Sequence, residues 1–150
     1  MTIQIRLASA ADLRTVAELF DGYRRFYGQP PDYVLAEAFL RDRFTNNDSV
    51  VFLAIDPQSG DGLGFVQLYP SFSSVAAQPI WILNDLFVSP AKRKCGVGRA
   101  LLDAAREHGI ATGAKRLILS TAATNREARA LYERYGYKQD DVFLVYKLEL

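Results

Sequence analysis

The sequence has very little cysteine and histidine: its 150 residues include one of each, Cys95 and His108. A single cysteine cannot form a disulfide within the chain, and a single histidine cannot build a histidine-rich metal site, so no metal is expected. Hydrolysis by a Ser-His-Asp triad is also disfavoured, because His108 would have to be its base. From its spacing, His108 is expected on the outer part of a helix, in contact with solvent and without a functional role.

Excess charge of one sign and long apolar runs are also missing. The 18 Lys and Arg residues are balanced by 17 Asp and Glu residues, which leaves a net charge of +1. A dedicated nucleic-acid binder is normally far more basic, so no nucleic-acid partner is expected. No run of about 18 apolar residues occurs, and the first residues lack the apolar stretch of a signal peptide. We therefore expect no membrane span and a cytoplasmic location.

What the chain does have is the composition of one ordinary globular domain. Hydrophobic residues make up 49% and charged residues 23% of its 150 residues, a length close to the commonest domain size. Such a chain buries roughly 70% of the surface that it exposes when unfolded, which suffices for a core without disulfides. Residues 1–150 are therefore predicted to form a single domain.

The hydrophobic pattern predicts the elements of the first half of the chain. Ser9 is typical of a helix N-cap, with Asp12 as its capping-box partner. The predicted elements are a strand at Thr2–Leu7, helices from Leu13 to about Gly28 and at Val34–Phe44, and strands at Val50–Ile55 and Leu63–Tyr69. The turn formers of Asp56–Gly62 indicate that these two strands form an antiparallel hairpin. Pro70–Pro79 is predicted to be a polar loop.

The second half adds a strand–helix–strand unit. Ile80–Val88 is a nearly continuous apolar run, and such a run is typical of a strand buried on both faces. The other predicted elements are a helix at Ala100–Ala111, a strand at Arg116–Ser120, a helix at Thr124–Tyr135 capped by Thr124 and stopped by Gly136, and a last strand at Val142–Leu150. The expected fold class is α/β (α+β), with order βααβββαβαβ and a mixed, mostly antiparallel sheet containing one parallel crossover.

The segment from Asp85 to Leu102 carries the strongest functional signal. A buried strand leads into a loop with Gly96 and Gly98 and then directly into a helix, an arrangement whose backbone N–H groups can converge on an anion. The cations around it are Lys92, Arg93, Lys94 and Arg99. This combination suits a multiply charged phosphate ligand.

Two common phosphate motifs do not fit. A P-loop requires Gly-Lys-Ser/Thr, whereas Gly98 is followed by Arg99-Ala100. A dinucleotide fingerprint requires a small residue at the position of Leu101 and an N-terminal βαβ unit, and neither is present. From the glycines alone, a turn with solvated lysines is an equally good interpretation.

Two motifs in order resolve this choice by resemblance. Arg93-x-x-Gly96-x-Gly98 resembles the Q/R-x-x-G-x-G/A motif of the GNAT superfamily of N-acetyltransferases. Leu119–Tyr137 is similar to that family's strand, Asn-containing turn, A-x-x-L-Y helix and G-F/Y ending. The predicted element order matches the family from about Ile3 onward, and the chain looks closest to small polyamine/histone-type acetyltransferases.

The resemblance implies acetyl-CoA as co-substrate. Its pyrophosphate would lie on backbone amides of the loop, and its pantetheine arm would run beside the preceding strand, between splayed parallel strands. The residues implied to bind it are Leu86, Phe87, Val88, Arg93, Lys94, Cys95, Gly96, Val97, Gly98, Arg99, Ala100 and Asn125. The position of Cys95 near a helix N-terminus should favour the thiolate form of its side chain. The thioester of acetyl-CoA would not reach this residue, so no catalytic role is expected for it.

Tyr132 matches the family tyrosine that protonates the departing CoA thiolate. Asn125 and Tyr132 are seven residues apart and therefore share one helix face. A phenol and a thiolate are comparably basic, which makes this proton transfer nearly thermoneutral. The alternative is that Tyr132 is a core aromatic beside Leu131 and Tyr135.

Asn84-Asp85 interrupts an otherwise apolar strand. An unpaired buried carboxylate is costly, so Asp85 should be hydrogen-bonded, ion-paired or facing a cavity. The resemblance implies that Asp85 takes a proton from the amine, directly or through water. A structural salt bridge is an almost equally good interpretation.

The sequence thus predicts an N-acetyltransferase in which an amine attacks the thioester within a ternary complex. The acceptor would be a small amine or basic peptide, bound partly by the aromatic and acidic residues of Phe20–Phe44. A homodimer is expected, because both faces of the last strand are apolar. The alternative function is a non-catalytic CoA-binding sensor or interaction module with the same fold.

Overall fold

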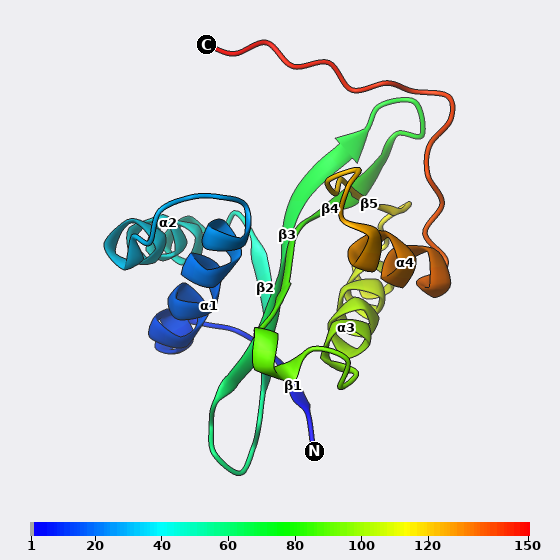
Figure 1. Ribbon diagram of the computed structural model, residues 1–150. Coiled ribbons are helices and arrows are strands. Elements are labelled where there is room, and N and C mark those ends of the chain that lie inside the picture. The colour runs from blue at the N-terminus through cyan, green and yellow to red at the C-terminus, as the bar shows by residue number, and fades with distance from the viewer. Residues whose placement is uncertain (1) are drawn as a thin grey trace. The chain divides into compact units, whose positions relative to one another are not determined.

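The computed structural model describes residues 2–150, which form two compact units, one up to Ser120 and one from Thr121. The first unit holds the sheet and three α-helices (Figure 1). Its main elements are β1 (Gln4–Leu7), α1 (Leu13–Phe26), α2 (Tyr33–Asn46), β2 (Val50–Ile55), β3 (Gly62–Ser73), β4 (Gln78–Val88), α3 (Val97–Ala111) and β5 (Leu117–Leu119), with short 3₁₀ turns η1 (Ala10–Asp12) and η2 (Pro90–Lys92).

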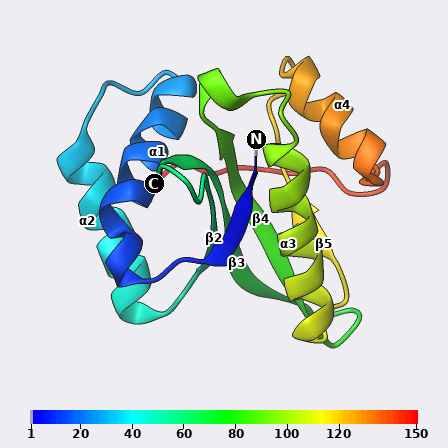
Figure 2. The same ribbon diagram turned by 90° about the horizontal axis from the view of Figure 1, so that it is seen from below.

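The five strands form one sheet in the order β1-β2-β3-β4-β5. The first three pairings are antiparallel and β5 runs parallel to β4, which confirms the predicted mostly antiparallel sheet with one parallel crossover. Helices α1 and α2 cover one face of this sheet and α3 covers the other (Figure 2). Within residues 2–150, every helix falls short of the length and apolar character that a membrane span requires.

The main core lies between the sheet and the α1/α2 pair. Phe20 of α1 and Leu40 of α2 pack with Leu53, Phe65 and Phe87 from three neighbouring strands. Burying one such side chain stabilises the folded state by about 1.5–3 kcal/mol. The helix starts are fixed locally, since the Asp12 carboxylate accepts the Ser9 N–H at 3.0 Å as the capping pattern predicts.

The predicted polar loop Pro70–Pro79 is wrong, because β3 continues to Ser73 and β4 already begins at Gln78. The two strands form a ribbon joined by a short turn in which Ala77 has a φ of 53°. The pairing of β3 with β2 ends at Leu68. Beyond that residue one side of β3 is an open edge, where Pro70 can sit without an N–H to donate.

A bulge interrupts the pairing of β3 with β4. Gln67 lies opposite Asp85, but the next residue, Leu68, lies opposite Leu83, so Asn84 has no partner in the register. Because side chains alternate along a strand, the extra residue places Leu83 and Asp85 on opposite faces of the sheet. Asp85 therefore shares the α1/α2 face with Gln67.

The second unit contains α4 (Arg126–Tyr135), which ends at Gly136 as predicted. The residue that caps its N-terminus is Asn125, whose Oδ1 accepts the Ala128 N–H at 3.2 Å. The prediction of Thr124 as the cap is therefore wrong by one residue. Asparagine and threonine both cap well, and the sequence alone does not separate two adjacent candidates.

The predicted last strand at Val142–Leu150 is also wrong for this structure. Residues 138–150 contain neither helix nor strand, and the side chains from Val142 to Tyr146 are 74–88% exposed. A strand requires a neighbouring strand to satisfy its backbone groups, and alternating apolar residues do not supply one. The element order of the described residues is therefore βααβββαβα, within the predicted fold class.

Candidate active site

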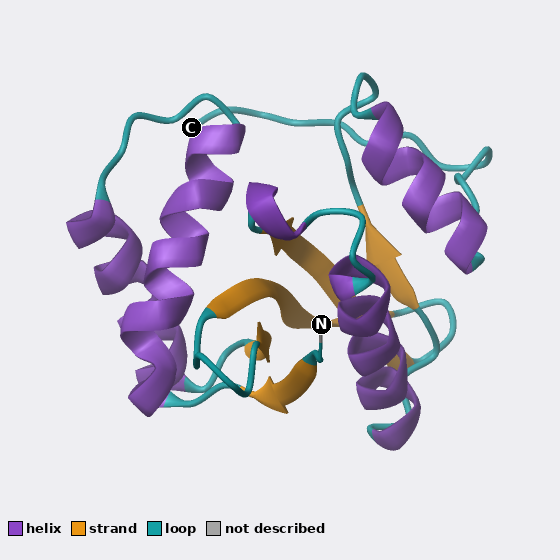
Figure 3. Cartoon of the chain, turned by 60° about the horizontal axis from the view of Figure 1, so that its bottom comes forward, coloured by secondary structure: helices purple, strands orange, loops and turns teal. Residues whose placement is uncertain are grey.

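The loop between β4 and α3 leads through the short turn η2 into the N-terminus of α3 (Figure 3). Lys94 and Gly96 have φ values of 61° and 86°, so two left-handed residues lie immediately before the helix. Helix α3 begins at Val97, three residues earlier than predicted. The Val97 and Gly98 N–H groups therefore belong to the first helical turn, which favours a negative charge.

Strand β4 continues past its parallel neighbour. The ladder between β4 and β5 covers Trp81–Leu83 and Leu117–Leu119. The last residues of β4, Leu86, Phe87 and Val88, follow the end of that ladder and are not paired with β5. The placement of a pantetheine arm beside these residues stays a prediction.

Arg93 has a contact that sequence reasoning missed. Its guanidinium lies 5.5 Å from the Phe26 ring centroid and 5.8 Å from that of Phe87, and its Nε donates to the Val88 carbonyl at 3.2 Å. Its backbone N–H donates to Pro90 O at 3.5 Å. The Arg93 side chain thus connects the loop to α1 through cation–π contacts.

Asp85 is 2% exposed and fully hydrogen-bonded. Its Oδ2 accepts from Gln67 Nε2 at 2.5 Å, and its Oδ1 accepts from Asn84 Nδ2 at 2.8 Å. The Tyr23 hydroxyl of α1 lies within hydrogen-bond reach of Asp85 and, at 3.3 Å, of Asn84 O, and these two acceptors share its one hydrogen. Both amide partners are neutral, so hydrogen bonds from neutral groups, the first of the predicted possibilities, hold this carboxylate.

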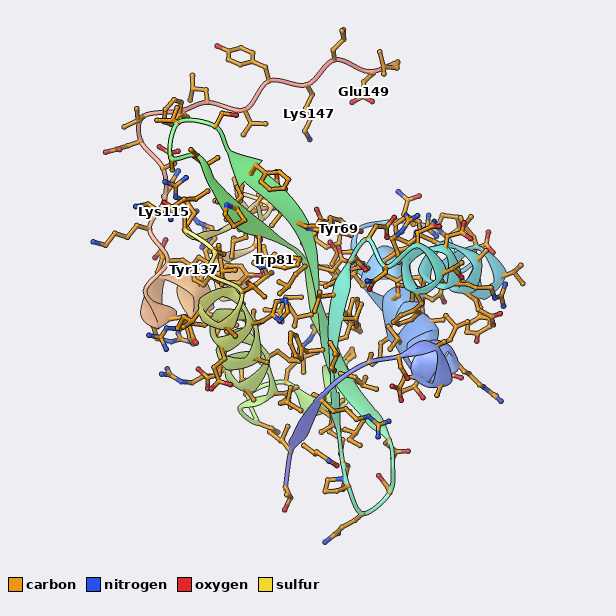
Figure 4. The ribbon with its side chains drawn as sticks, turned by 180° about the vertical axis from the view of Figure 1, so that it is seen from behind. Tyr69, Trp81, Lys115, Tyr137, Lys147 and Glu149 are labelled. Carbon is orange, nitrogen blue, oxygen red and sulfur yellow. The ribbon has the colours of Figure 1, made fainter. Side chains whose placement is uncertain are left out.

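Burial raises the pKa of the Asp85 carboxyl, although hydrogen bonds from Asn84, Gln67 and Tyr23 act in the opposite direction. Burial, and then the Asp85 charge, raise the pKa of Tyr69 to about 12. Figure 4 shows Tyr69 on the α2 side of the sheet and Trp81 on the α3 side. A carboxyl with a raised pKa is a better proton acceptor than an ordinary aspartate.

The acidic residues expected to bind the acceptor are occupied in local structure. Asp21 accepts the Asp32 N–H at 2.9 Å and pairs with Arg25 at 3.4 Å. Asp32 caps α2 by accepting the Leu35 N–H at 3.1 Å, and Glu37 forms an ion pair with Arg41. The expectation of an acidic acceptor wall is therefore unsupported for these carboxylates.

The aromatic residues of the same segment remain available. Phe26 and Tyr27 are 52% and 46% exposed, and their rings contact each other at 5.2 Å. The Tyr23 ring lies 5.0 Å from that of Tyr27 and its hydroxyl reaches the Asp85 group. Aromatic side chains therefore extend from Asp85 to the end of α1.

In the second unit, Tyr132 is 8% exposed and its ring lies 5.8 Å from that of Tyr137. Burial raises the pKa of Tyr137 to about 12. Asn125 uses its side-chain oxygen to cap α4, which leaves its Nδ2 group outside that bond. The structure thus gives Asn125 a capping role beside the predicted ligand contact.

The other two singled-out residues differ in outcome. Cys95 is an exposed free thiol. The expectation that His108 is solvated is wrong: its ring packs against Phe52 at 5.6 Å and Trp81 at 4.9 Å, and its Nε2 is buried without a hydrogen-bond partner in the described structure. Helix α3 lies against the sheet along the side that carries His108, so this ring completes the packing.

Sequence reasoning also missed Gln67, which contacts Asp85, and Ser49, which contacts Gln67. Gln67 is fully buried, and its Oε1 accepts from Ser49 Oγ at 2.9 Å. One signal could have found it, because Gln67 is a polar residue inside an otherwise apolar strand, as Asp85 is. Two such residues on neighbouring strands would satisfy each other's hydrogen bonds.

The mixed sheet, the glycine-containing loop before α3 and the buried Asp85 on β4 are the features expected of an N-acetyltransferase that uses acetyl-CoA. The profile of the Acetyltransferase (GNAT) family matches residues 13–137. The chain belongs to this family, and acetyl transfer from acetyl-CoA is its activity.

Individual relatives agree with this assignment. The chain is 47% identical over 148 residues to an uncharacterized N-acetyltransferase, YhfO, of Bacillus subtilis (strain 168), covering 99% of this chain and 98% of the relative. A crystal structure of a probable acetyltransferase aligns with a TM-score of 0.93 and 37% identity, covering 98% and 97%. An aminoalkylphosphonate N-acetyltransferase of Salmonella typhimurium (strain LT2) is 34% identical over 102 residues, covering 67% and 66%.

Proposed function

We propose that this protein transfers the acetyl group of acetyl-CoA to the primary amine of a small molecule, by direct attack in a ternary complex. The observation that carries this proposal is the buried, hydrogen-bonded Asp85 on the α1/α2 face, two residues before Phe87. The aminoalkylphosphonate specificity in the name of one relative supports a small amine over a basic peptide.

Each residue has an assigned step. The neutral amine attacks the thioester carbon, while backbone amides near Phe87 and Val88 polarise the carbonyl. As the new N–C bond forms and the C–S bond breaks, the amine proton passes through one water to Asp85, which is too buried for direct contact. Tyr132 gives its hydroxyl proton to the CoA thiolate. The products are an N-acetyl amide and CoA, and exchange with solvent restores both residues.

Binding of acetyl-CoA is assigned to the loop and to the divergent end of β4. The amides from Arg93 to Gly98 would surround the pyrophosphate, with the Arg93 side chain supporting the loop through its contacts with Phe26 and Phe87. The Nδ2 group of Asn125 would donate to the pantetheine arm. No metal is assigned to this reaction.

A thermal-shift assay tests the binding part of the proposal. Coenzyme A at one hundred times its dissociation constant should stabilise the folded protein by about 2.7 kcal/mol. Gly98→Asp places a negative side chain in the first turn of α3 and should abolish the shift, whereas Ala111→Asp, at the exposed far end of α3, should retain it. An unchanged melting temperature for the wild type would contradict the proposal.

The expected homodimer and cytoplasmic location remain proposals. Residues 142–146 are apolar and 74–88% exposed, and exposed apolar surface of this kind is typical of an interface. We assign this segment to contact with a second copy of the chain.

The proposed cytoplasmic location rests on Cys95, which is an exposed free thiol and therefore suits a reducing compartment.

A further inference from the structure

Gln67 and Asp85 form a buried polar pair on the sheet face that α1 and α2 cover. The two residues lie opposite each other on β3 and β4, and they are 0% and 2% exposed. Their side chains meet at 2.5 Å, from Gln67 Nε2 to Asp85 Oδ2. A glutamine in such a position must satisfy both its oxygen and its nitrogen, or it destabilises the fold.

Ser49 satisfies the other end of the Gln67 amide. Its Oγ lies 2.9 Å from Gln67 Oε1. An amide oxygen can accept but not donate, so the Ser49 hydroxyl must be the donor. The carboxylate sets which end of the amide faces Asp85, because a flipped amide would bring its oxygen against a carboxylate oxygen, and the Ser49 hydroxyl then holds the amide oxygen in place.

We propose that Gln67 is a positioning residue that fixes the orientation of the Asp85 carboxylate, and that Ser49 in turn fixes the orientation of the Gln67 amide. The inference rests on the proposed function, in which Asp85 accepts the amine proton. With Oδ2 held by Gln67 and Oδ1 by Asn84, the remaining lone pairs of the carboxylate point in defined directions. Gln67 transfers no proton itself.

Titratable and charged groups from α1, α2 and β3 act on Asp85 or on its neighbour Tyr69. Tyr23 from α1 hydrogen-bonds to Asp85, and Tyr69 from β3 interacts with its charge. Arg43 at the end of α2 and Asp48 beyond it act on Tyr69. Because the pKa of Tyr69 is about 12, that phenol stays neutral while Asp85 titrates.

The direct test is a carbon-13 NMR titration of the Asp85 side-chain carboxyl, which needs neither acceptor nor acetyl-CoA. Gln67→Leu removes a hydrogen bond to a charged group, so the midpoint should rise by about one to two pH units. Ser49→Ala should raise it by less, since the amide remains but can rotate. Gln78→Leu and Ser71→Ala, on the same two strands but outside this chain of hydrogen bonds, should leave it unchanged.

The reaction supplies a second readout. With acetyl-CoA and the best amine of a panel, the acid limb of kcat/KM should move upward in Gln67→Leu and Ser49→Ala, while KM for acetyl-CoA stays the same. If Gln67→Leu does not fold, Ser49→Ala carries the test by itself.

Two failures are distinguishable. An Asp85 midpoint and an acid limb that coincide with wild type in both variants would overturn the role of Gln67, even if Asp85→Asn is inactive. An Asp85→Asn protein with wild-type rate and acid limb would instead overturn the proposed base, while the NMR midpoints still report on Gln67.

Discussion

The Gln67 amide nitrogen lies 2.5 Å from the Asp85 carboxylate, where β3 and β4 place the two residues opposite each other. Asp85 lies on the same face of the sheet as Phe87, two residues further on, which packs in the core with α1 and α2. The bulge at Asn84 turns Leu83 to the opposite face, so the acid and the aromatic residues of α1 lie on one side of the sheet.

Asp85→Asn should lower the rate of acetyl transfer by roughly 10²–10⁴-fold and remove the acid limb of the pH–rate profile. The physical reason is that an amide cannot accept the amine proton. Steady-state rates across the pH range check this, with CoA binding measured in parallel. A variant within about twofold of wild type would mean that Asp85 is structural.

The same substitution should change how stability depends on pH. The folded-state pKa of Asp85 is raised above its ordinary value of 3.8, so its stabilising contribution is complete below that value and is lost as the pH rises through the folded pKa. Asp85→Asn lacks this loss, so its free energy of unfolding should gain on wild type as the pH rises above about 4. Urea unfolding at several pH values measures the difference, and a constant difference would contradict it.

His108 should affect stability with the opposite sign. Burial lowers its pKa below the ordinary 6.5, so its contribution is complete above that value and is lost as the pH falls below it. His108→Phe keeps a ring between Phe52 and Trp81 but cannot titrate. The variant should therefore lose less stability than wild type when the pH drops from about 7.5 to 5. Parallel losses in urea unfolding would show that the pKa of His108 is the same in the folded and unfolded states.

Much of the fold could be predicted because the period of the apolar residues differs between helices and strands. The strand at Val50–Ile55 has the predicted bounds, and Gly136 ends α4 as expected. The bulge at Asn84 could not be predicted, since it depends on the register between two strands rather than on either strand alone. The continuation of β3 through Pro70 was missed because a proline is compatible with an edge strand but is equally typical of a loop.

The candidate site was predictable where a motif fixes the backbone, as in the loop from Arg93 to Gly98. It was not predictable where side chains from distant segments meet. The contact of Arg93 with Phe26 joins residues far apart in the chain, and the pair of Gln67 and Asp85 depends on the register between β3 and β4. The carboxylates of Asp21 and Asp32 carried the right charge but serve helix ends and turns.

Tyr132→Phe should retain CoA binding and lose roughly 10²–10⁴-fold in rate. The substitution keeps the ring that packs on Tyr137 and removes the hydroxyl that would protonate the thiolate. The alkaline limb of the wild-type profile should disappear with it, whereas Tyr135→Phe on the same helix should behave like wild type. Equal rates for both variants would make Tyr132 a packing residue.

Sedimentation at high protein concentration should show a dimer. Val145→Asp introduces a charge into the exposed apolar segment and should shift the equilibrium from dimer toward monomer. Val75→Asp, in the fully exposed β3–β4 turn, should leave the dimer unchanged. A wild-type species with the mass of one chain at every concentration would end this proposal.

The most direct test of the whole account is to incubate the protein with acetyl-CoA and a panel of small amines, including aminoalkylphosphonates, amino acids, polyamines and aminoglycosides, with basic peptides alongside. Release of the CoA thiol and formation of the N-acetyl product are followed together, for wild type and for Tyr132→Phe. The account predicts that at least one small amine is acetylated in equal amount to the CoA released, and that the variant is slower. Tight CoA binding with no acetylated product from any amine would contradict it and would favour a non-catalytic CoA-binding protein.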